Sequence, residues 1–428
     1  MSAGTRRVVV LGAGSAGEHF VGALRRLDDE IEIAVVEHGL AGARNAPGAA
    51  EAVTGVLDRE EVWGWRDFVT DGRSDAYHVG WLAEQQAELV RGEARVVREG
   101  VVSAGERELE YDELVIATGS SPATPPIDGL DGVPYWTSRD AVWADAVPES
   151  LVVLGGGPVG AELAQFFSRM GASVTVVETN ERLLSKIDPE AGELLQQRFV
   201  DEGIEVRAGR RVSSVSGDDS GVRVDLGSGE TIDTARLLVA TGRVPNVDGL
   251  GLETLGIEVT RRGVTVDDRL RAGDGVWAIG DVSGVGQLTH LGKYQARVAA
   301  SNVAGIDRAA DYRAIPGAVF TDPQVASVGT TDGDGVVTAS FTIDGGRLST
   351  YERPRRPGLV KLAADASRRV LVGAVAVGPE AGEWLGQLTL AVRAETPLDV
   401  LLDTIQPYPT FSEAIFAALL ELESALAG

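Results

Sequence analysis

Short apolar runs without polar alternation recur along this chain, and helical patterns separate them. Such runs lie at residues 8–11 and 33–36 in the first third of the sequence, and at residues 151–154 and 174–177 in the middle. Runs of this kind are typical of strands that are buried on both faces of a parallel sheet. The chain therefore predicts two doubly wound α/β segments, which form an internal repeat.

The pattern changes after about residue 311. Strand-like runs at residues 318–320, 359–362 and 370–377 precede amphipathic patterns near residues 380–394 and 412–426. Strands followed by helices in this way are typical of an α+β domain. The predicted fold is therefore α/β, with two Rossmann-like dinucleotide-binding domains and a separate C-terminal α+β domain.

A glycine-rich turn follows the first strand of each doubly wound segment. The turn glycines are Gly12, Gly14 and Gly17 in the first copy, and Gly155, Gly157 and Gly160 in the second. In each copy a carboxylate, Glu37 or Glu178, closes the next apolar run. Glycines let the backbone approach a diphosphate at a helix N-terminus, and the carboxylate can accept hydrogen bonds from a ribose. The sequence therefore predicts two dinucleotide sites.

Other strand ends carry small or acidic residues that repeat between the segments. They are Ala117, Thr118 and Gly119 in the first segment, Gly242 in the second, and Gly280 with Asp281 after it. An aspartate at such a strand end can bind the sugar or ribityl hydroxyls of a cofactor, or it can be an ordinary turn residue. The sequence leaves both interpretations of Asp281 open.

The composition restricts the possible partners. Acidic residues number 64 and basic residues 39, and the net charge of −25 argues against a nucleic-acid surface or an anionic membrane. No uninterrupted apolar stretch reaches the length of a membrane span, so we expect a cytoplasmic protein. The chain has no cysteine, which excludes a disulfide, a thiol nucleophile and a thiolate metal site. The four scattered histidines lack metal-ligand spacing, and no metal is expected.

Several motifs occur together in one order along the chain. Besides the glycine turns, they are Ala-Thr-Gly at 117–119, Ala-Thr-Gly-Arg at 240–243, Glu162, Gly280 with Asp281, Phe-Thr-Asp-Pro at 320–323, and Pro409-Thr410 with Ser412-Glu413. In these motifs the whole chain resembles the flavoproteins of the pyridine nucleotide-disulfide oxidoreductase family. The resemblance implies an FAD-binding domain at 1–148 and 269–310, an NAD(P)-binding domain at 149–268, and a C-terminal dimerisation domain at 311–428.

The resemblance also implies how the cofactors are held. The first glycine turn and Glu37 would bind the ADP part of FAD, Asp281 would hold its ribityl chain, and the second turn would bind a nicotinamide nucleotide. Glu178 would repel a 2′-phosphate, so NAD(H) is favoured over NADP(H), although Arg182 nearby weakens this preference. His290 precedes a helix whose N-terminus faces the flavin in the family. For the His290 side chain itself, packing is favoured over proton transfer.

The redox centre of the family is missing from this chain. Arg44 and Ala49 align with its two cysteines, and Val53 aligns with the lysine that pairs with the glutamate at position 162. A buried carboxylate without a partner is costly or becomes protonated. Our hypothesis is that Arg44 replaces the lysine as the partner of Glu162 or contacts an acidic substrate. A solvated loop arginine is the alternative.

A second loss lies near the C-terminus. The family's histidine and glutamate in this segment shuttle protons across a homodimer, and here Tyr408 replaces the histidine while Glu413 remains. A tyrosine with an ordinary pKa of about 10 is not a base near neutral pH, but it can donate a hydrogen bond or act as an acid. A packing aromatic at the dimer interface is the other interpretation of Tyr408.

These losses leave three functions open. The first is an FAD-dependent oxidoreductase that passes hydride from NAD(P)H to the flavin and on directly to a small-molecule acceptor. The second is a non-redox isomerase or cyclase with bound FAD, and the third is a binding protein with structural FAD. The expected catalytic residues are Arg44, Glu162, Tyr408 and Glu413. Four aromatic residues either line a flat substrate site or, as the favoured alternative, pack in the core or a lid; they are Trp63, Trp65, Tyr77 and Trp81.

Overall fold

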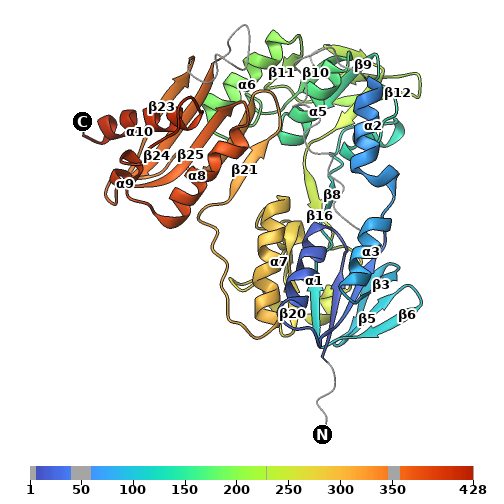
Figure 1. Ribbon diagram of the computed structural model, residues 1–428. Helices are drawn as coiled ribbons and strands as arrows, with labels where there is room; N and C mark the ends of the chain where they lie inside the picture. Colours follow the sequence, from blue (N-terminus) through green and yellow to red (C-terminus); the bar gives the residue numbers. More distant parts are fainter. Residues whose placement is uncertain (1–5, 40–58, 228, 346–356, 428) are drawn as a thin grey trace. The chain divides into compact units, whose positions relative to one another are not determined.

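The computed structural model describes residues 6–39, 59–227, 229–345 and 357–427 (Figure 1). Arg44, Ala49 and Val53 lie outside these residues. The chain forms two compact units. Unit 1 contains Met1–Ala46, Trp63–Ser121 and Arg243–Asp311, and unit 2 contains Pro47–Val62, Pro122–Gly242 and Tyr312–Gly428. No helix among the described residues is long and apolar enough to cross a membrane.

A six-stranded sheet forms the centre of unit 1. Its strand order is β19 (Arg271–Gly273), β20 (Val276–Ala278), β7 (Glu113–Ile116), β1 (Arg7–Leu11), β2 (Glu32–Glu37) and β3 (Ala87–Arg91). All neighbouring strands are parallel except β19 and β20. Although β20 follows the second doubly wound segment in the sequence, it joins the sheet of the first beside β7.

Different elements cover the two faces of this sheet. On one face, apolar side chains of α1 (Ser15–Arg25), α3 (Ala76–Glu84) and α7 (Thr289–Val303) pack against it. The other face packs against an antiparallel sheet of β4 (Ala94–Arg98), β5 (Val101–Ala104) and β6 (Arg107–Glu110), together with η3 (Leu252–Leu255) and the hairpin of β17 (Val259–Thr260) and β18 (Gly263–Val264). Burial on both faces explains why the central strands are continuously apolar.

Shorter elements complete unit 1. They are η1 (Asp71–Arg73), η4 (Gly280–Ser283), and β16 (Arg243–Pro245), which pairs with β8 (Ser120–Pro122). Helix α2 (Arg59–Val69) begins in the part of the chain assigned to unit 2 and ends in the part assigned to unit 1.

The first half of unit 2 repeats the plan of unit 1. Its parallel sheet has the order β11 (Glu205–Arg207), β10 (Ser173–Val177), β9 (Ser150–Leu154) and β15 (Arg236–Val239). The helices are α4 (Ser138–Val142), α5 (Pro158–Arg169) and α6 (Pro189–Asp201), with the short η2 (Leu130–Gly132). A second antiparallel sheet, β12 (Ser214–Asp218), β13 (Gly221–Asp225) and β14 (Thr231–Thr234), packs against β9 and β15. Both halves of the predicted repeat therefore contain an antiparallel meander that the alternating pattern did not predict.

The second half of unit 2 is an antiparallel sheet with helices on one face. The strand order is β21 (Pro316–Val319), β22 (Gln324–Gly329), β25 (Val370–Gly378), β24 (Gly358–Asp365) and β23 (Val336–Ile343). Helices α8 (Ala381–Ala394), α9 (Leu398–Leu402) and α10 (Ser412–Ala427) contribute to the same apolar core. The predicted fold class is confirmed, whereas β22 and β23 were missed. In β23, polar side chains such as Thr338 and Ser340 alternate with apolar ones, and the strand has no continuous apolar run.

A buried ion pair joins the two halves of unit 2. The Lys361 ammonium of β24 lies 2.9 Å from Asp188 Oδ2 and 2.8 Å from Glu190 Oε1, and the hydroxyl of Thr331 donates to Asp188 Oδ2 at 2.8 Å. The side chain of Asp188 is 2% exposed and that of Lys361 is 15% exposed. Asp188 also caps α6, since its Oδ1 accepts from the N–H of Glu190.

Burial and hydrogen bonding act in opposite directions on this pair. Burial raises the pKa of Asp188, but the bonds from Lys361 and Thr331 outweigh it and hold that pKa below its ordinary value. Burial lowers the pKa of Lys361, but the bonds to Glu190 and Asp188 raise it above its ordinary value. The pair is therefore charged across the neutral range and fastens α6 to the C-terminal sheet.

We expect Lys361→Met to lower the free energy of unfolding by about 3 kcal/mol, because the nearly buried carboxylate of Asp188 would lose its cation. Urea denaturation of the two proteins measures the difference. Lys186→Met is the matched control, since Lys186 is exposed, and it should change the free energy of unfolding by less than about 0.5 kcal/mol. Equal effects of the two substitutions would contradict this role of Lys361.

The stability difference between the wild type and Lys361→Met should depend on pH at both extremes. Because the folded pKa of Asp188 is depressed, its contribution is present above the ordinary value of 3.8 and is lost as the pH falls through the folded pKa. Because the folded pKa of Lys361 is raised, its contribution is present below 10.5 and is lost as the pH rises through the folded pKa. Urea denaturation at a series of pH values should show a constant stability difference between the two proteins at intermediate pH. A stability difference that increases at acid pH would contradict this explanation.

Candidate functional site

The first glycine turn is shaped by close backbone contacts. Gly12 follows β1 with φ +105°, and a Cβ there would lie 2.5 Å from the carbonyl oxygen of Ala117. A Cβ on Gly17 would collide with the carbonyl oxygen of Gly12. A Cβ on Gly14, by contrast, would have no atom within 4 Å. Gly14 is the N-cap of α1, so none of the described residues fills the position at the helix N-terminus where a diphosphate binds in this type of turn.

Glu37 is fixed beside this turn by two backbone groups. Its Oε2 accepts from the N–H of Ala13 at 2.7 Å, and its Oε1 accepts from the N–H of Gly39 at 2.7 Å. Ala13 lies between the first two glycines of the turn. The carboxylate and the turn are therefore held together, and the arrangement fits the adenosine part of a dinucleotide.

The second glycine turn has the same geometry. Gly155 has φ +107°, and a Cβ there would lie 2.5 Å from the carbonyl oxygen of Ala240. A Cβ on Gly157 would again have no atom within 4 Å, and one on Gly160 would collide with the carbonyl of Gly155. The N–H of Gly156, between the first two glycines, donates to Glu178 Oε2 at 2.6 Å. The two copies of the internal repeat therefore share this hydrogen bond between the turn and the carboxylate.

Glu178 is more enclosed than Glu37. It is 7% exposed, and its Oε1 accepts from the backbone N–H and the side-chain amide of Asn180 at 2.7 and 2.5 Å. Arg182 does not face this carboxylate as a free cation. Its guanidinium donates to the carbonyls of four residues, namely Leu183, Leu184, Ser185 and Ile187. That Arg182 weakens the preference for NAD(H) stays a prediction; four of the five N–H donors of its guanidinium stabilise its own loop.

Asp281 belongs to a hydrogen-bonded network with two residues that the sequence analysis did not select. Its Oδ2 accepts from the hydroxyl of Ser120 at 2.5 Å. Arg243 Nε donates to the same hydroxyl at 2.7 Å and lies 3.8 Å from Asp281 Oδ2. Ser120 and Arg243 each follow an Ala-Thr-Gly segment, so their matching positions in the repeat were the available signal. The network gives Asp281 defined partners, unlike an ordinary turn aspartate.

Another side chain connects to the first Ala-Thr-Gly segment. The hydroxyl of Thr118 donates to the carbonyl of Asn246 at 2.6 Å, and the amide of Asn246 donates to the carbonyl of Thr118 at 2.9 Å. Close by, Gly280 donates its N–H to Gln295 of α7 at 2.7 Å. Asn246 and Gln295 thereby hold two of the predicted cofactor-binding segments in place, which local sequence patterns do not reveal.

Glu162 has a partner that the sequence did not predict. Its Oε1 accepts from the backbone N–H of Phe320 at 2.9 Å. Arg44, its expected partner, lies outside the described residues. The carboxylate is therefore oriented by the segment before β22 of the C-terminal domain.

The same face of α5 also binds Asp322, two residues after Phe320. Gln165 exchanges two hydrogen bonds of 2.8 Å with the backbone of Asp322, and Arg169 Nη2 lies 2.7 Å from its carboxylate. Arg169 is also paired with Glu202 at 2.7 Å. Because Glu162, Gln165 and Arg169 are spaced three and four residues apart, they lie along one side of the helix. The helix that begins at the second glycine turn is thus fixed to the C-terminal domain.

Tyr408 lies four residues before α10, and Glu413 lies in the first turn of that helix. The Tyr408 side chain is 81% exposed, so it does not pack against the described residues of its own chain. Glu413 Oε2 accepts from the N–H of Thr410 at 3.2 Å. The same domain exposes further large apolar side chains, among them Ile405 at 94% and Leu390 at 66%.

The other predicted side chains have different surroundings. His290 lies in the first turn of α7 and is exposed, so its side chain is not part of the core. Trp81 packs into the core of unit 1 against Gly22. Trp65 and Tyr77 are 65% and 70% exposed, and these two do not pack in the core. Trp63 is half-buried and lies 4.9 Å from the guanidinium of Arg66.

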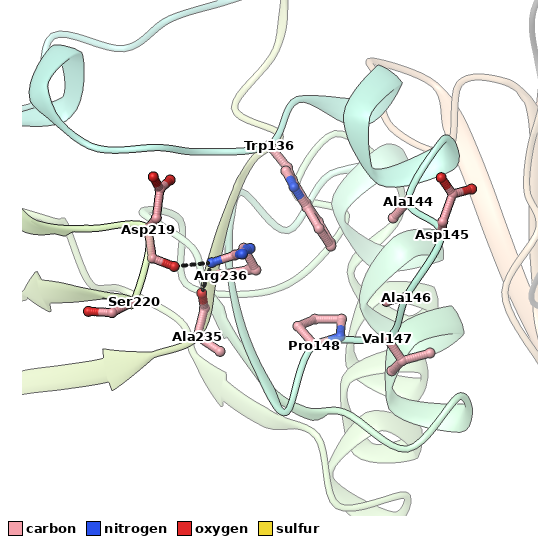
Figure 2. Close-up of a pocket in the computed structure, with 10 residues that line it drawn as sticks. All are labelled: Trp136, Ala144, Asp145, Ala146, Val147, Pro148, Asp219, Ser220, Ala235 and Arg236. Carbon is pink, nitrogen blue, oxygen red and sulfur yellow. Dashed lines mark hydrogen bonds between the residues drawn. The ribbon is translucent and has the colours of Figure 1, made fainter.

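A cavity of about 460 Å³ lies elsewhere in unit 2 (Figure 2). Trp136, Pro148 and Arg236 are among its lining residues. Arg236 begins β15, whereas Gly242 follows the carboxyl end of that strand. The cavity is therefore at the opposite edge of the sheet from the second glycine turn.

Comparison with known proteins identifies the family. The family model described as pyridine nucleotide-disulphide oxidoreductase matches residues 6–301, and the model of the dimerisation domain of that family matches residues 315–419. Dihydrolipoyl dehydrogenase from Haloferax volcanii is 32% identical, over 96% of this chain and 95% of the relative. Mercuric reductase from Acidithiobacillus ferrooxidans is 35% identical, over 86% and 69% of the two chains.

Solved structures show the same architecture. The crystal structure of LpdA from Mycobacterium tuberculosis has a TM-score of 0.84 and 26% identity, over 98% of this chain and all of that one. The HOCl-induced flavoprotein disulfide reductase RclA of Escherichia coli, as its Cu(II) complex, has a TM-score of 0.88 at 22% identity, over 98% and 99% of the two chains. With both family models matched in order and the paired turns in place, this chain belongs to the pyridine nucleotide-disulphide oxidoreductase family, whose cofactor is FAD.

Proposed function

We propose that this protein is an FAD-dependent oxidoreductase that passes electrons from NADH through the flavin directly to a small-molecule acceptor, without a dithiol relay. The observation that carries the proposal is the absence of cysteine from a chain with two intact dinucleotide turns. No side chain of this protein can form the redox disulfide, because a thiolate is the required nucleophile. The acceptor must then react at the flavin itself.

The residues of unit 1 fit two parts of FAD, namely its ADP part and its ribityl chain. The N–H groups at the start of α1 and the carboxylate of Glu37 would bind the diphosphate and the adenosine ribose. Asp281, held by Ser120 and near Arg243, would accept hydrogen bonds from ribityl hydroxyls. When bound, FAD supplies a carrier that takes an electron pair from reduced nicotinamide and gives it to the acceptor. The protein contributes orientation and a fixed electrostatic environment.

The residues at the second glycine turn favour the binding of NADH over that of NADPH. A 2′-phosphate would come close to the buried carboxylate of Glu178, and repulsion between the two anions is strong where water is excluded. Arg182 cannot offset this repulsion without giving up its bonds to loop carbonyls. A ribose with free hydroxyls meets no such penalty.

Glu162 is proposed to be a positioning group beside the flavin rather than the partner of a lysine. The N–H of Phe320 holds its carboxylate, and Val53 aligns with the lysine of the family. The hypothesis that Arg44 also pairs with Glu162 or contacts an acidic substrate remains part of the proposal.

A second copy of the chain is proposed to cover the C-terminal domain. The match to a dimerisation domain and the exposed side chains of Ile405 and Tyr408 support a homodimer. In such a dimer, Tyr408 and Glu413 would be supplied to the active site of the partner subunit. Tyr408 would donate a hydrogen bond or a proton to the acceptor there.

We expect NADH to bleach the absorbance of the bound oxidised flavin in anaerobic stopped-flow mixing, at least about tenfold faster than NADPH does at the same concentration. A quinone or another electron acceptor added afterwards should restore the absorbance without any thiol. An unchanged spectrum with both nucleotides would overturn the proposal and favour a non-redox enzyme or a binding protein with structural FAD.

The matched variants for this experiment are Gly157→Ala and Gly132→Ala. Both new methyl groups would enter space with no atom within 4 Å, so both proteins should fold and retain FAD. Only Gly157→Ala places the methyl group at the second turn, where it should slow bleaching by NADH at least about tenfold by obstructing the diphosphate. Equal bleaching rates in the two variants would show that NADH binds elsewhere.

A further inference from the structure

Helix α3 is attached to α1 at three successive positions. His78 Nδ1 lies 2.9 Å from Glu18 Oε1. One turn further along α1, the ring of Trp81 lies about 3.1 Å from where a Cβ on Gly22 would be. Another turn on, Arg25 Nε donates to the carbonyl of Gln85 at 2.9 Å. The spacing of three and four residues on both helices places all contacts on facing sides.

The first of these contacts is close to the proposed FAD site. Glu18 is in the first turn of α1, the helix whose N-terminus follows the first glycine turn. Its side chain is only 13% exposed. It interacts electrostatically with Glu37, which is bonded to that turn, and with Lys293 of α7. Burial holds the pKa of Glu18 above its ordinary value, and His78 opposes this rise without cancelling it.

A carboxylate at this place competes with the cofactor. The positive end of a helix stabilises any anion near its first turn, and two anions at one helix end repel each other. Glu18 and the diphosphate of FAD would both approach the N-terminus of α1. A partner that holds the Glu18 carboxylate on the side of α3 leaves the N–H groups of the helix for the diphosphate.

We propose that His78 is a positioning residue for FAD, which holds the Glu18 carboxylate against α3. The inference rests on the FAD site proposed above, and neither residue belongs to the motifs that mark that site. It also gives α3 a function beyond packing, because the helix carries the group that makes an acidic first turn compatible with an anionic cofactor.

The test is the dissociation constant of FAD, measured by fluorescence on refolded or stripped protein with FAD added back. His78→Leu should weaken FAD binding about three- to tenfold, and His78→Gln, which keeps a hydrogen-bond donor, should weaken it less. Glu18→Gln should restore tight binding in the His78→Leu background. The loss should also shrink as salt is added, because salt screens the repulsion.

His19→Leu is the matched control, since His19 is the next residue on α1 and its side chain is exposed. It should leave the dissociation constant unchanged. Tight binding by His78→Leu, or weak binding that Glu18→Gln does not restore, would overturn the inference and leave His78 with a packing role. If the wild-type protein itself does not bind FAD, the proposed function is wrong. The lack of binding is then not caused by the substitutions at His78 or Glu18.

Discussion

A hydrogen bond from the middle of a glycine turn to the carboxylate at the end of the next strand underlies both proposed nucleotide sites. Ala13 makes it to Glu37 and Gly156 makes it to Glu178. The bond requires the turn to run close to neighbouring backbone, and only glycine allows this at positions 12 and 155. It also fixes the carboxylate before any ligand binds. The parallel sheets, the start of each helix and the order of the motifs all serve this local arrangement.

Much of the fold could be predicted because its signals are local. Continuous apolar runs such as residues 8–11 identify strands buried on both faces, and glycines at fixed spacing identify the turns between strand and helix. The antiparallel meanders and β23 were missed because their strands alternate or are short. The order of strands in the first sheet, with β20 beside β7, follows from tertiary packing rather than from any local pattern.

Residues of the candidate site that belong to a sequence motif could be predicted. Contacts between distant segments of the chain could not. Glu37 and Glu178 stand at strand ends, Asp281 lies in η4 just after β20, and all three were identified from the sequence. The bond from Phe320 to Glu162 joins residues 158 positions apart, and no spacing rule suggests it. Arg182 is near Glu178 in sequence, but this proximity does not reveal that its donors satisfy carbonyls of its own loop.

The contacts of α5 and α6 connect the second nucleotide site with the C-terminal domain. Asp322 is held by Gln165 and Arg169, and Lys361 is held by Asp188. The start of α5, where we propose that a nucleotide binds, is therefore joined through packed polar contacts to the domain that carries Tyr408 and Glu413. The loss of both cysteines has left this framework intact.

The central claim is that the flavin is the only store of electrons between NADH and the acceptor. Anaerobic titration of the FAD-loaded protein with NADH tests it directly, because each electron acceptor in the protein consumes its own equivalent. The account predicts complete flavin reduction at one equivalent of NADH per FAD. A requirement for a second equivalent, or a flavin that NADH does not reduce, would contradict it.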